Sequence, residues 1–160
     1  MATILTALAV VVMLAAALHD LAARTIPNAF PTALALVGAG TALMTGTVLT
    51  SLSMGATVFA IAALCWRQGW LGGGDVKLLG GTALALSPTT VPTFIAAVAI
   101  SGGALAALYL VLHRVVPGAG PARPRHLLAR LARAEQWRLR RQDSLPYACA
   151  IAAGFLFVTL

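Results

Sequence analysis

The chain has 160 residues, of which 60% are hydrophobic and only 9% are charged, and its net charge is +7. An ordinary soluble domain carries about a quarter charged residues, so this composition excludes a soluble globular fold. The apolar runs are continuous rather than alternating, which excludes a transmembrane β-barrel. We therefore expect an all-α polytopic membrane protein.

Four charge-free stretches predict the helices, at 1–18, 25–66, 78–112 and 144–160. The first and last each suit one crossing of about twenty residues. The second is too long and is divided by turn signals from Gly46 to Ser53, and the third is divided from Ser87 to Pro92. The sequence thus predicts six short transmembrane helices near 2–20, 28–46, 51–67, 73–87, 91–113 and 145–160.

In this topology every charge lies at one membrane face. Charged residues follow the first helix, separate the third from the fourth, and fill 114–143 between the fifth and sixth, whereas the other two links carry none. Loops rich in Lys and Arg stay in the cytoplasm. We expect this face to be cytoplasmic and both termini to be extracytoplasmic.

Two acids, Asp20 and Asp75, lie near the membrane core at the cytoplasmic edge. Ionisable residues at membrane depth are energetically costly and usually functional. A structural explanation stays open, in which each acid pairs with a neighbouring base, Arg24 or Lys77. The sequence does not decide between the two.

The second acid belongs to an unusual stretch, in which Gly72, Gly73 and Gly74 precede Asp75. Glycine permits backbone conformations closed to other residues and lets another chain approach closely. A loop without side chains beside an acid suits a site that admits a polypeptide. A phosphate-binding loop is disfavoured, because Asp75 is negative and the GK[ST] ending is missing.

Three stretches together resemble the type IV prepilin peptidase family. Asp20 with Ile26-Pro27-Asn28 looks like the family's first aspartate and its IPN, and 72–78, GGGDVKL, looks like its GxGDxKL motif. Leu145-Pro146-Tyr147, followed by an Ala-rich helix with Gly154, is similar to its C-terminal signature. The three stretches span nearly the whole chain in the family's order.

This resemblance implies a GxGD-type intramembrane aspartic protease fold, with 1–160 forming one membrane peptidase domain in the bacterial inner membrane. It implies Asp20 and Asp75 as the catalytic pair and Gly72, Gly73, Gly74 and Lys77 as the active-site loop. The implied substrates are prepilins and pseudopilins, which have a basic leader, a glycine before the cut and a hydrophobic helix with a glutamate near its start. No cofactor or metal is expected.

The chain departs from the larger family members, which carry a cysteine cluster and a methyltransferase activity between the first two helices. It passes directly from one helix to the next, and so is similar to the short, peptidase-only branch of the tight-adherence (Flp) pilus systems. Its first loop, DLAARTIPN, also keeps Arg24 as the only base. We expect this loss of basic residues to affect lipid or substrate contacts rather than chemistry.

Helix ends suggest which acid keeps the proton that an aspartic dyad shares. Asp20 lies at the negative C-terminal end of its helix, which disfavours the anion, and Asp75 lies at the positive N-terminal end of its own. The hypothesis is that Asp75 is the more readily ionised member. Such a pair titrates as a unit.

Several nearby residues have less distinctive patterns. Lys77 is two positions after Asp75, so the two side chains do not share a helix face, and a lipid, substrate or simple anchoring role stays open. His19 adjoins Asp20 but points elsewhere, and a structural role is favoured over a catalytic one. Cys65 and Cys149 are too few for a four-ligand zinc site and are interpreted as apolar filling.

The segment 117–143 begins as a Pro/Gly linker and then places leucines and Trp137 among arginines. This composition predicts an interfacial amphipathic helix on anionic lipid headgroups. A docking arm for the pilus assembly machinery is a second interpretation. We expect no nucleic acid partner, because the segment is tethered within a membrane domain.

Two rival functions remain. A six-helix channel or transporter would use Asp20 and Asp75 as an ion or proton path, but it should also place polar residues deeper toward the far face. Scattered Thr and Ser are present there, without charge. An inactive scaffold with the family fold is disfavoured by the retention of both acids and the glycine loop.

Overall fold

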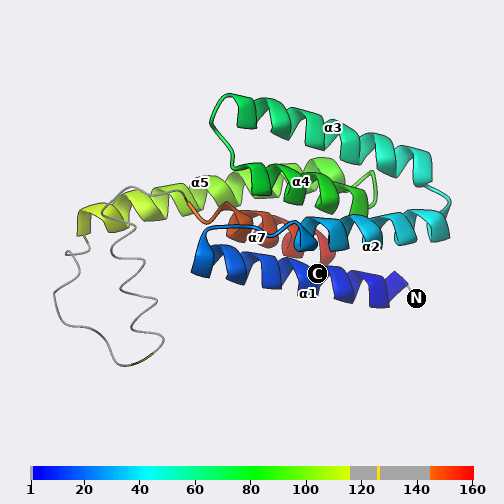
Figure 1. Cartoon of the computed structure of the whole chain (residues 1–160), viewed down its shortest axis with the longest axis horizontal. Coiled ribbons are helices and arrows are strands. Elements are labelled where there is room, and N and C mark those ends of the chain that lie inside the picture. Colours follow the sequence, from blue (N-terminus) through cyan, green and yellow to red (C-terminus); the bar gives the residue numbers. More distant parts are fainter. Residues whose placement is uncertain (1, 116–125, 127–144) are drawn as a thin grey trace. The chain divides into compact units, whose positions relative to one another are not determined.

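A computed structural model describes residues 2–115, 126 and 145–160, and these form six α-helices, labelled as in Figure 1. The structure confirms the all-α class and agrees with each predicted helix to within a few residues at either end. The basic segment, 114–143, lies mostly outside the described residues. The helices are α1 (Ala2–Ala23), α2 (Ala29–Thr45), α3 (Val48–Arg67), α4 (Gly73–Ala85), α5 (Val91–Val115) and α7 (Tyr147–Thr159).

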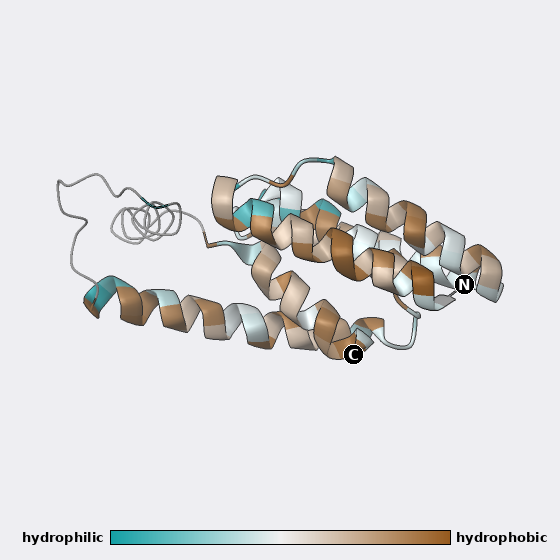
Figure 2. Ribbon diagram, turned by 90° about the horizontal axis from the view of Figure 1, so that it is seen from below, coloured by the Kyte–Doolittle hydropathy of each residue, from teal (hydrophilic) through white to brown (hydrophobic). Residues whose placement is uncertain are grey.

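Three of these helices, α1, α3 and α5, are long and apolar enough to cross a membrane. The apolar helices α2 and α7 are shorter, with 17 and 13 residues, and α4 has 13. Hydrophobic residues predominate along the helices (Figure 2), and large side chains such as Leu36, Leu43 and Leu49 are exposed. Exposed apolar surface on this scale suits contact with lipid, whereas six complete crossings stay a prediction.

The chain divides into two compact units. The first comprises Met1–Ser101 with Pro146–Leu160 and holds both aspartates, and the second is Gly102–Leu145. Helices α1 to α4 and α7 all belong to the first unit. The predicted candidate site lies entirely within it.

Helix α4 lies at the centre of the first unit, where it packs against α2, α3 and α7 (Figure 1). Helix α1 completes the unit by packing against α2 and α7. Burial of apolar side chains is the dominant favourable term in such packing. The largest side chains that are fully buried here include Met13, Leu34, Leu78, Phe94 and Phe155.

Two glycines let α2 and α4 cross with their backbones in contact. A Cβ on Gly38 would lie 2.6 Å from backbone atoms of Leu84 and Ala85, and a Cβ on Gly81 would lie 2.7 Å from the carbonyl oxygen of Pro31. Close approach of this kind requires residues without side chains. The crossing holds the start of α2 beside the start of α4.

At two helix ends the chain turns at a residue with a left-handed backbone conformation. Helix α2 ends at Gly46, with φ of 70°, where the sequence predicts a break. Helix α1 ends at Arg24, whose φ is 55° although it has a side chain, and its N–H donates to the carbonyl oxygen of Asp20 at 2.8 Å. The chain therefore turns immediately after the first aspartate and runs back along the unit as α2.

Candidate active site

Asp20 lies in the last turns of α1 and is buried, with 6% of its surface exposed. Its Oδ2 accepts a hydrogen bond of 3.2 Å from the backbone N–H of Ala148, the second residue of α7. The first N–H groups of a helix have no partner inside the helix, so they are free to bind an acceptor from elsewhere. The start of α7 thereby holds the Asp20 carboxyl in place.

Asp75 is the third residue of α4 and is partly buried. Its carboxyl accepts a hydrogen bond from the backbone N–H of Gly72, the residue that precedes the helix. An acid at this position commonly reaches back in this way. Burial of Asp75 and the charge of Asp20 both act on this carboxyl, so the fold brings the two predicted acids within electrostatic range of each other.

The helix ends around the two acids are more alike than the sequence suggests. Each carboxyl accepts a hydrogen bond from a backbone N–H at a helix N-terminus, from Ala148 for Asp20 and from Gly72 for Asp75. An N–H donor stabilises the anion. Helix α7 therefore adds a donor beside Asp20 that could not be placed before the fold was known, whereas burial and the charge of Asp20 act against ionisation of Asp75. That Asp75 is the more readily ionised member stays a prediction.

The three glycines before Asp75 differ in how much room surrounds them. A Cβ on Gly72 would lie 2.8 Å from Oδ2 of Asp75, and one on Gly74 would lie 2.9 Å from Cβ of Ile26. A Cβ on Gly73 would meet Trp66 only at an ordinary 3.5 Å. The motif thus needs glycine at its first and third positions.

The expectation that these glycines supply unusual backbone conformations was wrong. Gly72 has φ of −74° and ψ of 146°, which any residue adopts, and Gly73 and Gly74 open α4. Among the described glycines, positive φ occurs at Gly46 and Gly69. The sequence pattern identified the right residues, but steric closeness to Asp75 and Ile26 is the reason for them.

Lys77 connects the two aspartate motifs. Its Nζ donates a hydrogen bond of 2.9 Å to Oδ1 of Asn28, at the start of α2. The partner is thus a neutral amide rather than a carboxylate. Both residues are exposed, on the side of α4 where α2 and α3 meet it.

The remaining residues of interest have structural contacts. His19 donates from Nδ1 to the carbonyl oxygen of Thr25 at 2.8 Å, and its ring lies 5.8 Å from that of Phe30. These contacts shape the turn into α2. Cys65 and Cys149 form no disulfide, and Sγ of Cys149 donates to the carbonyl oxygen of Ala17 at 3.7 Å.

A metal-binding site would need several ligating side chains close together. Within residues 2–115, 126 and 145–160, no group of three or more His, Cys, Asp or Glu could hold a metal ion.

Residues 7–107, more than half of the chain, match the model of the type IV leader peptidase family, and they include both aspartates and the glycines. The chain belongs to the type IV leader peptidase family. The resemblance of the IPN and GGGD stretches is thus confirmed at the level of the family. No curated protein and no solved structure matches the chain.

Membership of this family indicates the general activity of the protein, which is the removal of a leader peptide from a prepilin substrate. Together with three helices long enough to cross a membrane, it indicates a membrane protein. The start of α7, which contacts Asp20, lies outside the matched residues. The sequence did not predict that Ala148, Ile26 and Asn28 contact the candidate site, although each of these residues lies in or next to one of the three stretches that resemble the family.

Proposed function

We propose that this leader peptidase is an aspartic endopeptidase in which Asp20 and Asp75 form the catalytic pair. The proposal is carried by the positions of these two carboxyls from α1 and α4. Asp20 is buried and fixed by Ala148, and its charge reaches Asp75. Two carboxyls close together cannot both ionise easily, so they share a proton. A shared proton supplies one acid and one base in the same site.

Peptide hydrolysis by such a pair proceeds through a water molecule. The ionised carboxylate accepts a proton as the water oxygen attacks the scissile carbonyl carbon. The protonated carboxyl donates its proton to the developing oxyanion, and the carbon–nitrogen bond breaks after proton transfer to the leaving nitrogen. The N–H groups of Ala148 and Gly72 would hold the two carboxyls in position during these transfers.

We further propose that the substrates are type IV prepilins and pseudopilins of the Flp kind, cut at the cytoplasmic face of the bacterial inner membrane. The direct passage from α1 to α2, through a short turn without an inserted domain, supports the peptidase-only branch. The placement of Arg24, Arg67 and Lys77 beside the aspartate ends of their helices supports the cytoplasmic assignment.

A channel or transporter remains the alternative, and the packing disfavours it. A cavity of about 270 Å³ includes Thr6, Thr41 and Thr90 in its lining. It lies toward the ends of α1 and α2 that are remote from the aspartates. Along those helices, Met13 and Leu34 lie between this cavity and the aspartates, and both are fully buried. An ion or proton path would need polar groups where these apolar side chains pack.

The test is co-expression of the protein with an Flp-type prepilin, followed on a gel from precursor to mature pilin. Wild type should process the precursor, and Asp20→Asn and Asp75→Asn should each abolish processing because either loss removes half of the pair. Each variant must be shown to insert at the wild-type level. Full processing by either inserted variant would disprove the dyad, and no processing of several such prepilins by wild type would reject the proposed substrate.

A further inference from the structure

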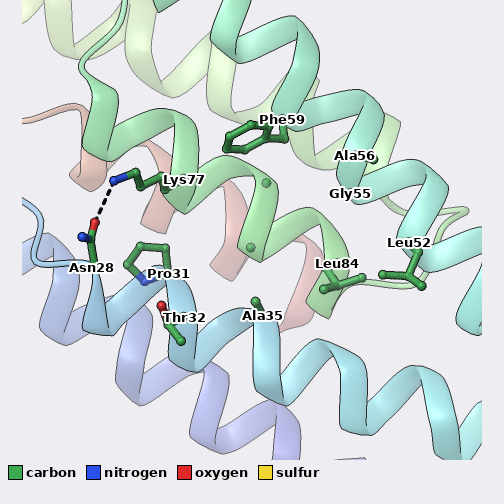
Figure 3. Close-up of a pocket in the computed structure, with 12 residues that line it drawn as sticks. Asn28, Pro31, Thr32, Ala35, Leu52, Gly55, Ala56, Phe59, Lys77 and Leu84 are labelled. Carbon is green, nitrogen blue, oxygen red and sulfur yellow. Dashed lines mark hydrogen bonds between the residues drawn. The ribbon is translucent and has the colours of Figure 1, made fainter.

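A groove runs along α4 between α2 and α3 and has a volume of about 650 Å³ (Figure 3). Helices α2 and α3 both pack closely on α4 but meet each other much less, which leaves the groove open between them. Small residues make up much of its lining. These are Ala35 from α2, Gly55 and Ala56 from α3, and Gly80 and Gly81 from α4.

The polar and apolar groups of the groove are separated along its length. Figure 3 shows Asn28 and Lys77, joined by their hydrogen bond, at one end and Leu52 and Leu84 at the other. The helices that form its walls carry exposed leucines, including Leu36 on α2 with 70% of its surface accessible. An apolar molecule can therefore reach the groove from the lipid, with its polar end beside Lys77.

The polar end of the groove adjoins the candidate catalytic centre. Lys77 follows Asp75 by two residues in the first turns of α4, and the glycines that precede Asp75 present no side chains. A chain that leaves the groove beside Lys77 is two residues along α4 from Asp75, whose side chain lies on another face of the helix. The polar end of the groove therefore lies on the first turns of the helix that carries Asp75.

We propose that the groove seats the hydrophobic helix of the prepilin substrate, with the N-terminal end of that helix at Asn28 and Lys77. The inference rests on the proposed peptidase function and adds the surface that binds the substrate. The glycines of the lining are filled by contacts among α2, α3 and α4, so Ala35 and Ala56 are the small residues that would let a substrate helix approach closely. The leader would then extend past the glycines to the aspartates.

Charge complementarity indicates what kind of helix fits. The N-terminal end of a helix is electropositive, and Lys77 places a further positive charge beside it without a carboxylate as its hydrogen-bond partner. An acidic residue in the first turn of the seated helix relieves both. The groove therefore favours an apolar helix that begins with an acid over one that begins with a base.

The first experiment fills the groove. Ala56 lines it, whereas Thr57, the next residue of α3, does not, and both are exposed. Ala56→Trp should lower the processing rate of a co-expressed Flp-type prepilin by roughly tenfold or more, because lost binding of remote parts of a substrate lowers turnover. Thr57→Trp should process within about twofold of wild type, as exposed substitutions outside a site do. Equal rates for the two variants would overturn the proposal.

The second experiment detects the seated helix without requiring cleavage. A photoreactive residue is placed at position 56 of the Asp75→Asn protein, and at position 57 in a parallel sample. Membranes that contain this protein and the co-expressed prepilin are then irradiated. Crosslinks from position 56 to the hydrophobic segment of the prepilin, absent from position 57, support the proposal. Crosslinks from position 56 to lipid alone would overturn it.

The cleavage and crosslinking experiments together distinguish the groove proposal from the catalytic assignment. Crosslinking at position 56 with no cleavage by wild type would retain the groove as the binding surface and reject the catalytic assignment. Cleavage by wild type, with no prepilin crosslink and no effect of Ala56→Trp, would retain the catalytic assignment and reject the groove.

Discussion

At the scale of single residues, the glycines before Asp75 differ in how much room surrounds them. Gly72→Ala and Gly74→Ala should each reduce processing strongly, because the new methyl groups would collide with the Asp75 carboxyl and with Ile26. A displacement of about 1 Å at a catalytic group lowers rates by up to about a hundredfold. The measurement is the rate of prepilin processing by purified protein in lipid.

Gly73→Ala is the matched control for this prediction. Its methyl group would meet Trp66 at an ordinary contact distance, and Ala is the better helix former, so activity should stay within about threefold of wild type. Equal losses at all three positions would contradict the steric explanation and would indicate that the backbone freedom of the whole stretch matters.

The same residues mark the limit of what the sequence could predict about the site. The two acids were predictable because they stand nearly alone in apolar sequence, and the resemblance named the glycines and Lys77. The reasons for the glycines were not predictable, since they depend on Ile26 and on the path of the Asp75 side chain. The contact of Ala148 with Asp20, 128 positions apart, is a product of tertiary packing that no local pattern records.

At the scale of helices, the crossing of α2 on α4 should depend on Gly38. Gly38→Ala would press a methyl group onto the backbone of Leu84 and Ala85, which cannot move aside as a side chain could. We expect a loss of about 1–3 kcal/mol in the free energy of unfolding, measured by thermal unfolding in detergent.

Gly40, on the same helix, provides the comparison, because a Cβ there would find nothing within 4 Å. Gly40→Ala should leave stability unchanged or raise it by up to about 1 kcal/mol through better helix propensity. If the two variants unfold at the same temperature, the close crossing of α2 and α4 does not contribute to stability as proposed.

The helices themselves were predictable because their ends are marked locally. Gly46 ends α2 and the Ser-Pro pair after α4 interrupts the next apolar run, so break signals alone divided the long stretches correctly. The order of packing was not predictable. That the short α4 is central, and that α7 returns to α1, follows from which small and large side chains fit together.

At the scale of the whole molecule, the proposed orientation can be checked by cysteine labelling. Cys65 and Cys149 are first replaced, and Gln68→Cys or Ser87→Cys, both at exposed sites in links between helices, is then introduced. A membrane-impermeant thiol reagent added to intact cells should label position 87 and leave position 68 unlabelled until the membrane is opened. The opposite pattern would place the aspartates outside the cytoplasm.

The basic segment offers a second check at this scale. A peptide comprising 122–143 should bind vesicles that contain anionic phospholipid, with about 1 kcal/mol gained for each arginine near the surface. Added salt should weaken the binding because it screens surface charge. Tight, salt-independent binding to vesicles of phosphatidylcholine alone would contradict the electrostatic part of this interpretation.

The shortness of α4 bears on how water reaches a reaction that consumes it. Thirteen residues extend about 20 Å, whereas the hydrocarbon core of a bilayer is about 30 Å thick. A central helix that is too short for its surroundings is accommodated by thinning of the adjacent bilayer. With α4 crossing the membrane as the sequence predicts, we expect the membrane surface, with its water, to be drawn toward the end of α4 that carries Asp75. Turnover should consequently be faster in bilayers of short-chain phospholipids than in those of long-chain ones, so that membrane thickness acts as a regulator of the enzyme.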